Sequence, residues 1–279
     1  MTDMAQRIPA RRTNALAAIA GLLMAVWAIP AIAQTACAGS YIFCDDFAGT
    51  SVDTAKWTVA DLNIASKYPV RPENIALTDV DDHGTTASVV DAMSFGDEHV
   101  AAPRQGGILI SKLRYGGGRY EVRMKNLTGP GGCSCFWNYY DSRYEPGPSR
   151  KRMYTEIDIE MPAHMTSPPA WRKWRRIVGL NTWSHTDSDR NATYINHRST
   201  IDPFDGEFHV FRFDWHDGSD GKRSIEWYID GELQASTRRH VSNAPAQIWV
   251  GTWPAPWPGM EYSFDIKHQY IDWVRISAL

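Results

Sequence analysis

The stretch Thr155–Met161 reads TEIDIEM and alternates acidic with β-branched or apolar side chains. Such alternation is typical of a β-strand, in which residues i, i+2 and i+4 share a face. Glu156, Asp158 and Glu160 therefore point the same way, and the two isoleucines between them occupy the opposite face. At about 3.3 Å per residue the outer Cα atoms lie roughly 13 Å apart, a gap that two glutamate side chains largely close. The strand thus predicts three carboxyl groups within reach of one another.

Three interpretations fit an acidic strand of this kind. It could be the solvated face of a structural strand, although three like charges on one face repel each other. It could supply oxygen ligands to a hard cation. It could also carry the two carboxyl groups, about 5–5.5 Å apart, that cleave a glycosidic bond with retention of configuration. The motif alone leaves these open, and the rest of the chain has to decide.

Residues 1–33 have the pattern of an export signal. A segment with three arginines precedes the mostly apolar run Leu16–Ile32, and Ala31-Ile32-Ala33 offers a cleavage site. The alternative is a membrane anchor, which Pro30 and the small residues at the cleavage site disfavour. We expect a signal peptide over 1–33, no membrane attachment after its removal, and a secreted or periplasmic protein with a single domain over 34–279.

The remaining chain of about 245 residues is a length that one all-β sandwich can occupy. Hydrophobic residues make up 43% of the sequence, enough for a sizeable core, and the net charge of −3 gives no case for a nucleic-acid partner. No helical period is sustained beyond the signal segment. Asp230-Gly231 predicts a two-residue hairpin turn, and the glycine run at 116–118 predicts a turn that leads into a strand at 119–125. More than ten short strand signals separated by turns predict an antiparallel β-sandwich or jelly roll.

Four cysteines in an exported chain make disulfides plausible. Cys37 and Cys44 bracket a short turn and could staple the new N-terminus. Cys133 and Cys135 share one face of a predicted strand, where a bridge would be strained, so two reduced thiols are an equal alternative. No cysteine or histidine pair has the spacing of a zinc site.

Five segments, in order along almost the whole mature chain, resemble glycoside hydrolase family 16. Members of that family have a concanavalin A-like β-jelly roll with a concave substrate cleft. The segments are YGGGRYEVRMK at 115–125, EIDIE at 156–160, FHVFRFDW at 208–215, IEWYIDGEL at 225–233 and IDWVRIS at 271–277.

The resemblance implies retaining hydrolysis by double displacement. Glu156 would be the nucleophile, Glu160 the general acid and then the general base, and Asp158 an assisting residue between them. Neighbouring carboxylates disfavour a second ionisation, which agrees with one group holding a proton near neutrality. The strand lacks the extra residue of the laminarinase-like branch (E-x-D-x-x-E), and in that respect is closer to the lichenase and xyloglucan-transferase branch.

The expected activity is that of an exported endo-β-glycan hydrolase, a β-1,3- or β-1,3-1,4-glucanase. The expected partner is a polysaccharide substrate, the protein is expected to be a monomer, and no cofactor is required. Two alternatives share the chemistry, namely a transglycosylase and a depolymerase of an acidic or substituted polysaccharide. An alternative of another class is a non-catalytic lectin on the same fold, which would need further Asn or Asp ligands where Met161-Pro162-Ala163 follow.

A glycan cleft also needs flat apolar walls on which sugar rings stack, and pockets are generally lined with aromatic side chains. Trp215, Trp227 and Trp273 are assigned to the core. For each cleft candidate the alternative is core packing as well. The resemblance and the strand alternation place the following residues in the cleft: Trp137, Tyr139, Tyr154, Asn181, Trp183, Trp253 and Trp257.

Departures from the family pattern bear on the substrate. Gly251 falls where lichenases carry a sugar-binding Asn, and Ile110 where they carry an Arg, so specificity for mixed-linkage glucan is not simply inherited. The segment Pro162–Arg176 contains Trp171, Trp174 and four basic residues. It is either an extra cleft wall that selects an acidic polysaccharide or a solvated loop whose charges balance nearby acids.

The resemblance finally implies a candidate for a structural calcium ion. Relatives bind it with backbone carbonyls and an Asp in the C-terminal strand, and Asp272 occupies the matching position. The alternative is a structural Asp whose carboxylate is held by protein hydrogen bonds.

Overall fold

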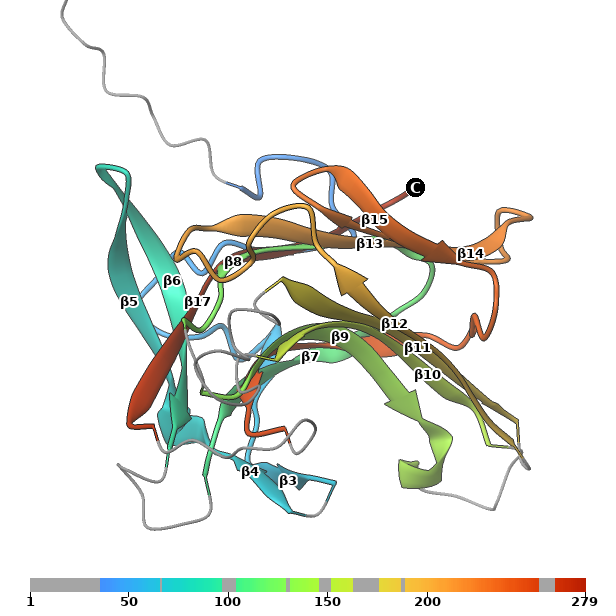
Figure 1. Ribbon diagram of the computed structural model, residues 1–279, viewed down its shortest axis with the longest axis horizontal. Helices are drawn as coiled ribbons and strands as arrows, with labels where there is room; N and C mark the ends of the chain where they lie inside the picture. Colours follow the sequence, from blue (N-terminus) through green and yellow to red (C-terminus); the bar gives the residue numbers. More distant parts are fainter. Residues whose placement is uncertain are drawn as a thin grey trace, which may run out of the picture. The chain divides into compact units, whose positions relative to one another are not determined.

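The computed structural model describes residues 36–65, 67–96, 104–128, 131–145, 152–162, 176–186, 189–255 and 264–279 (Figure 1). These residues form β-strands and two single-turn 3₁₀ helices. In chain order the elements are β1 (Phe43–Asp45), β2 (Trp57–Val59), β3 (Leu62–Ile64), β4 (Tyr68–Val70), η1 (Pro72–Asn74), β5 (Ile75–Asp82), β6 (Thr85–Phe95), β7 (Gly107–Tyr115), β8 (Gly118–Lys125), β9 (Cys133–Asp141), η2 (Ser142–Tyr144), β10 (Tyr154–Pro162), β11 (Ile177–Thr186), β12 (Asp189–Arg198), β13 (His209–Asp217), β14 (Arg223–Ile229), β15 (Glu232–Thr237), β16 (Ala246–Trp253) and β17 (Ile266–Ser277).

Two antiparallel sheets account for most of these strands. One has eight strands in the order β15-β14-β13-β8-β17-β6-β5, with β1 paired to β17, and the other has seven in the order β12-β11-β10-β9-β16-β7-β2. β3 and β4 form a separate two-stranded sheet. The predicted all-β antiparallel jelly roll is confirmed. Strands β3, β4, β5 and β12 carry no clear alternation and were not expected.

The core lies between the two sheets and joins residues from both. Phe136 on β9 packs against Phe213 on β13, with ring centroids 5.5 Å apart, and Ile157 and Ile159 of β10 belong to the same cluster. Each such side chain contributes about 1.5–3 kcal/mol by leaving water. The apolar face of the acidic strand therefore ties β10 to the opposite sheet.

The three tryptophans expected in the core are buried, although Trp273 keeps a small exposed fraction. Trp215 and Trp227 are fully buried in the cluster between the sheets. Trp273 is 8% exposed and is covered by the guanidinium of Arg275, which lies 4.1 Å from its ring centroid.

Two turns set the strand connections as the sequence predicts. Asp230 and Gly231 both have positive φ, 49° and 81°, the combination that a two-residue type I′ hairpin requires. The glycine run before β8 carries the chain from one sheet to the other, since β7 and β8 belong to different sheets. A Cβ on Gly117 would lie 2.8 Å from Cγ of Asp217, so only glycine fits there.

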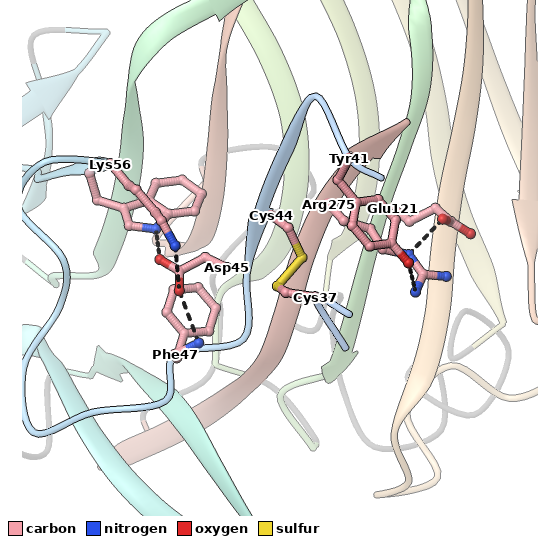
Figure 2. Close-up of a disulfide and its surroundings, with 9 residues drawn as sticks. Cys37, Tyr41, Cys44, Asp45, Phe47, Lys56, Glu121 and Arg275 are labelled. Atoms are coloured by element: carbon pink, nitrogen blue, oxygen red, sulfur yellow. Dashed lines mark hydrogen bonds and ion pairs between the residues drawn. A yellow bond between two sulfur atoms is a disulfide. The ribbon is translucent and has the colours of Figure 1, made fainter. Parts of the chain in front are cut away.

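The N-terminal end of the described chain is anchored to the C-terminal strand (Figure 2). β1 pairs with β17, and Cys37 forms a disulfide with Cys44. The carboxylate of Asp45 accepts hydrogen bonds from the Trp57 indole at 2.7 Å and the Phe47 amide at 3.1 Å. The pairing of Cys37 with Cys44 agrees with the expectation from the sequence.

Cys133 and Cys135 are also joined in a disulfide, which decides between the two alternatives that the sequence leaves open. Both lie on β9 and are almost completely buried.

Among the residues described, no helix has the length and apolarity needed to cross a bilayer.

The expected calcium residue is held by an arginine. Arg123 donates from Nη1 to Oδ2 of Asp272 at 2.5 Å and from Nη2 to Oδ2 of Asp82 at 2.7 Å. The three side chains are largely buried, with 24%, 18% and 18% exposed, and Arg123 also lies over the ring of Phe208. The Arg123 guanidinium already binds both carboxylates and offsets one of their two negative charges, and its own charge repels a cation. These residues therefore do not fit a calcium ion.

We predict that calcium does not stabilise this protein. Adding CaCl2 or EDTA should leave the melting temperature unchanged in differential scanning fluorimetry. Arg123→Met should lower the free energy of unfolding by about 1–3 kcal/mol, because two half-buried carboxylates lose their cation. Calcium should partly restore the stability of Arg123→Met. It should not restore the stability of the control variant Arg275→Met, which loses the ion pair with Glu121 at 2.8 Å. A fall in the melting temperature of the wild type with EDTA would contradict this account.

Candidate active site

The acidic strand β10 lies inside the seven-stranded sheet, between β9 and β11 (Figure 1). Residues directly opposite in antiparallel strands share a face. The pairing therefore surrounds each carboxyl with a defined pair of neighbours. These pairs are Tyr139 and Trp183 for Glu156, Trp137 and Asn181 for Asp158, and Cys135 and Gly179 for Glu160.

Hydrogen bonds from outside the strand ladder hold the backbone of β10 in place. The amide of Ile157 donates to Oδ1 of Asn138 at 2.9 Å. The indole of Trp227, from the opposite sheet, donates to the backbone oxygen of Asp158 at 3.1 Å. Thr155 Oγ1 donates to the backbone oxygen of Ala244 at 2.8 Å. These contacts limit any movement of the three carboxyls relative to the groove.

Glu156 is partly exposed and is held by a neighbour on its own strand. The hydroxyl of Tyr154 donates a hydrogen bond to Oε2 of Glu156, a contact that favours the charged carboxylate. Burial and the negative charge of Glu156 raise the pKa of Tyr154 far above its ordinary value. The tyrosine therefore stays protonated and remains a donor at every working pH.

Glu160 lies at the other end of the acidic face. Burial, together with the charge of Glu156, raises the pKa of Glu160 to about 8, although a hydrogen bond from Asn181 opposes the shift. Nδ2 of Asn181 lies 2.9 Å from Oε2 of Glu160. Gly179 lies directly beside the side chain, since a Cβ there would lie in van der Waals contact, at 3.4 Å, with both Cβ and Oε2 of Glu160. Glu160 is thus protonated at neutral pH.

Asp158 lies between the two glutamates and is almost completely buried. Burial and the charges of Glu156 and Glu160 raise its pKa well above the ordinary value, and a hydrogen bond from Trp183 opposes the shift. Low dielectric around the three groups disfavours more than one negative charge. Of the three groups, Glu156 is the one whose negative charge raises the pKa of both others.

A groove of about 1220 Å³ runs over this face. Six of the seven predicted cleft residues line it, and Trp257 lies outside the described residues. The six are Trp137, Tyr139, Tyr154, Asn181, Trp183 and Trp253.

Additional aromatic groups line the groove that sequence reasoning did not assign. Trp249 lies next to Trp137, with ring centroids 5.4 Å apart, and Tyr194 of β12 meets Trp183 edge-on at 4.7 Å. Trp249 could have been found, because it lies four residues before Trp253 on the same strand face. Tyr194 could not, because β12 has no clear strand signal.

One wall of the groove was also unexpected. Residues Leu62–Ala65, in and after β3, line it, and Tyr68 of β4 packs against Trp253 at 5.8 Å. Three arginines from outside the predicted set complete the lining, namely Arg114, Arg143 and Arg152. Of the segment Pro162–Arg176, residues 163–175 lie outside the described residues, so the role of Trp171 and Trp174 stays a prediction.

The two departures from the family pattern have structural causes. Gly251 has φ of +141°, and a Cβ there would lie 2.2 Å from the backbone oxygen of Gly107. No larger residue fits that position. Ile110 is 7% exposed and belongs to an apolar cluster with Trp137 and Trp253, so it supports the aromatic floor of the groove.

A metal centre at Glu160 is disfavoured by its neighbours. Its carboxylate oxygen and the Sγ atoms of Cys133 and Cys135 lie within 4.8 Å of one another. Metals bind thiolates, and these two sulfurs are bonded to each other.

Known proteins resemble this chain in sequence and in fold. A β-glucanase of Bacillus subtilis (strain 168) is 26% identical over 271 residues, covering 93% of this chain and 95% of that protein. The β-glucanase structure of Bacillus licheniformis has a TM-score of 0.61 at 21% identity and covers 87% of this chain and 100% of that one. A Bacteroides ovatus family 16 protein in complex with a glucan product has a TM-score of 0.65 at 16% identity, over 84% and 99%.

The model of glycosyl hydrolases family 16 matches residues 54–275. That span includes all three carboxyls of β10, every described residue of the groove, and both sheets apart from β1 and the last two residues of β17. The chain therefore belongs to glycosyl hydrolases family 16.

Proposed function

We propose that this protein is an exported, retaining endo-β-glycan hydrolase that cleaves β-1,3- or β-1,3-1,4-glucan. The observation that carries the proposal is the acidic face of β10, where one ionised and one protonated glutamate flank a buried aspartate in an open aromatic groove. The β-glucanase name of the Bacillus subtilis relative supports the substrate class. The apolar segment at the N-terminus supports export.

In the first step Glu156 attacks the anomeric carbon of the bound sugar. The glycosidic oxygen leaves with the bond electrons and takes the proton that Glu160 holds, so no free alkoxide is released. The product is a covalent ester between Glu156 and the sugar, with the anomeric configuration inverted once. The hydrogen bond from Tyr154 orients the attacking carboxylate.

In the second step Glu160, now ionised, accepts a proton from water as the water attacks the anomeric carbon. The bond to Glu156 breaks, Glu156 regains its negative charge and the configuration returns to β. Asp158 lies between the two groups, and burial together with the charges of Glu156 and Glu160 raises its own pKa. Burial raises the pKa of Glu160, as its role as the general acid requires.

The open groove favours an endo-acting enzyme. It is lined from β3 at one side to β12 at the other and presents several aromatic faces, so more than one sugar unit can bind at once. A pocket for a single sugar would be closed at one end.

The proposed substrate class is tested by incubating the protein with purified polysaccharides. We expect new reducing ends, released as oligosaccharides, from β-1,3-glucan or mixed-linkage β-glucan, and little release from agar or xylan. Chromatography of the products distinguishes internal cleavage from release of single sugars. Failure to cleave either glucan, by a folded protein, would overturn the proposal.

Glu156→Gln should abolish cleavage, lowering kcat by about 10⁴-fold or more, because the amide preserves shape but cannot form the glycosyl ester. Glu226→Gln is the matched control, because Glu226 lies on β14, in the sheet opposite β10, and forms an ion pair with Lys222. Reducing-end assays and circular dichroism measure activity and folding. If Glu156→Gln kept a tenth of the wild-type rate, the nucleophile assignment would be wrong.

Glu160→Gln should slow cleavage of a natural glucan far more than that of an aryl glycoside, whose phenolate departs without a proton. For the wild type, kcat/KM on glucan should fall as the pH rises through about 8, the pKa of Glu160, because the acid form is lost. The aryl substrate should show a much weaker alkaline fall. Equal losses on both substrates would count against Glu160 as the acid.

A further inference from the structure

One wall of the groove holds two guanidinium groups on a single buried carboxylate. Asp141, at the end of β9, has a fully buried side chain. Its carboxylate accepts from Nε and Nη2 of Arg143 at 2.9 and 2.7 Å and from Nε and Nη2 of Arg152 at 3.2 and 2.7 Å. The three residues line the groove, so this cluster carries one more positive than negative charge.

The protonation state of the cluster does not change that balance. Burial alone would raise the pKa of Asp141, but the hydrogen bonds from Arg152 and Arg143 lower it to about 2. The carboxylate is therefore ionised and both guanidiniums stay charged. Nearby, Arg114 forms an ion pair with Glu145, and those two charges cancel. Across these five groups three cations face two anions.

The arginine cluster lies close to the reacting groups. Arg152, Tyr154 and Glu156 share a face of the chain that leads into β10, since they are spaced two residues apart. The guanidinium of Arg152 lies over the Tyr154 ring at 5.1 Å from its centroid, and the Tyr154 hydroxyl donates to Glu156. One aromatic side chain therefore separates the cluster from the proposed nucleophile.

We propose that Arg143 and Arg152 form a subsite for a carboxylate group carried by the glycan, such as that of a uronic acid or an acidic substituent. This inference rests on the proposed glycan hydrolase function and specifies the substrate further. A guanidinium binds carboxylates through its N–H groups; Asp141 occupies the Nε and Nη2 edge of Arg143, and its Nη1 side is the one that would meet a ligand carboxylate. Asp141 fixes their position, and the side chain of Arg143 is 54% exposed, open to a ligand.

The rest of the site is compatible with an anionic chain. Burial and neighbouring charges raise the pKa of both Asp158 and Glu160, so the floor of the groove repels an acidic sugar less than three fully ionised carboxyls would. In the alternative explanation, the two arginines serve only to neutralise and hydrogen-bond the buried Asp141. A purely structural role would affect neutral and acidic substrates equally, and the two explanations are therefore separable.

The test compares two derivatives of one β-glucan with equal degrees of substitution, one carboxymethylated and one hydroxyethylated. The wild type should show at least a 5-fold higher kcat/KM on the carboxymethyl polymer at low salt. That preference should shrink in 0.3 M NaCl, because salt screens partly exposed charges. Arg143→Gln should reduce the preference about 5-fold, Arg143→Lys should retain part of it, and Arg275→Gln, outside the groove, should retain all of it.

Equal kcat/KM on the two derivatives, or equal losses on both in Arg143→Gln, would overturn the subsite and leave the proposed function intact. If neither the derivatives nor the unsubstituted β-glucan is cleaved, the proposed function fails, and titration calorimetry with carboxymethyl and hydroxyethyl oligosaccharides still tests the subsite. Tighter binding of the carboxymethyl ligand, lost in Arg143→Gln, supports it, and equal binding refutes it. If Arg143→Gln does not fold, the Arg143→Lys variant and the salt dependence of the wild type decide.

Discussion

The structure depends on one electrostatic constraint, the placement of three carboxyl groups on one partly buried face of a strand. Two-residue periodicity puts Glu156, Asp158 and Glu160 on the groove face, and the isoleucines between them enter the core. A shift of one residue in register would bury the carboxyls between the sheets and expose the isoleucines. The cost of that error is far larger than the stability of a typical domain can absorb. The chemistry and the register of β10 are therefore enforced by the same pattern.

Placing the three carboxyls together makes the stability of the folded protein depend on pH. The pKa of Glu160 rises from 4.5 to about 8, so the folded state binds this proton more tightly than the unfolded chain. Stability contributed by the protonated group is present at low pH and is lost as the pH rises from the unfolded value through the folded one. The extensive apolar core between the sheets offsets this cost. A catalytic acid at neutral pH is thus maintained by packing elsewhere in the fold.

The parts of the fold that were predicted from the sequence are those with a local signal. The strict alternation of β10, the Asp230-Gly231 turn and the glycines before β8 each have a direct physical meaning, and each is found as expected. The aromatic residues on β9, β11 and β16 follow from their shared strand faces. The proximity of Cys37 and Cys44 likewise follows from a short intervening turn.

Other features depend on contacts between distant segments, and no local pattern reveals them. The wall formed by β3 and β4, the position of Tyr194 and the clustering of Arg143 with Arg152 arise only when the sheets assemble. The calcium ion expected at Asp272 is disfavoured for a related reason, because Arg123 on the neighbouring strand β8 already binds that carboxylate. The disulfide between Cys133 and Cys135 was an even alternative at the level of sequence.

The central claim is that Glu156 attacks the sugar while Glu160 supplies the proton. It is tested most directly by incubating the protein with a 2-deoxy-2-fluoro β-glucosyl oligosaccharide that carries a good leaving group, since the fluorine slows breakdown of the ester. Digestion and tandem mass spectrometry then locate the label. We predict a single glycosyl ester on the peptide that contains 155–161, with the modification at Glu156. A label at Asp158 or Glu160, or inactivation by this reagent without any ester, would contradict the account.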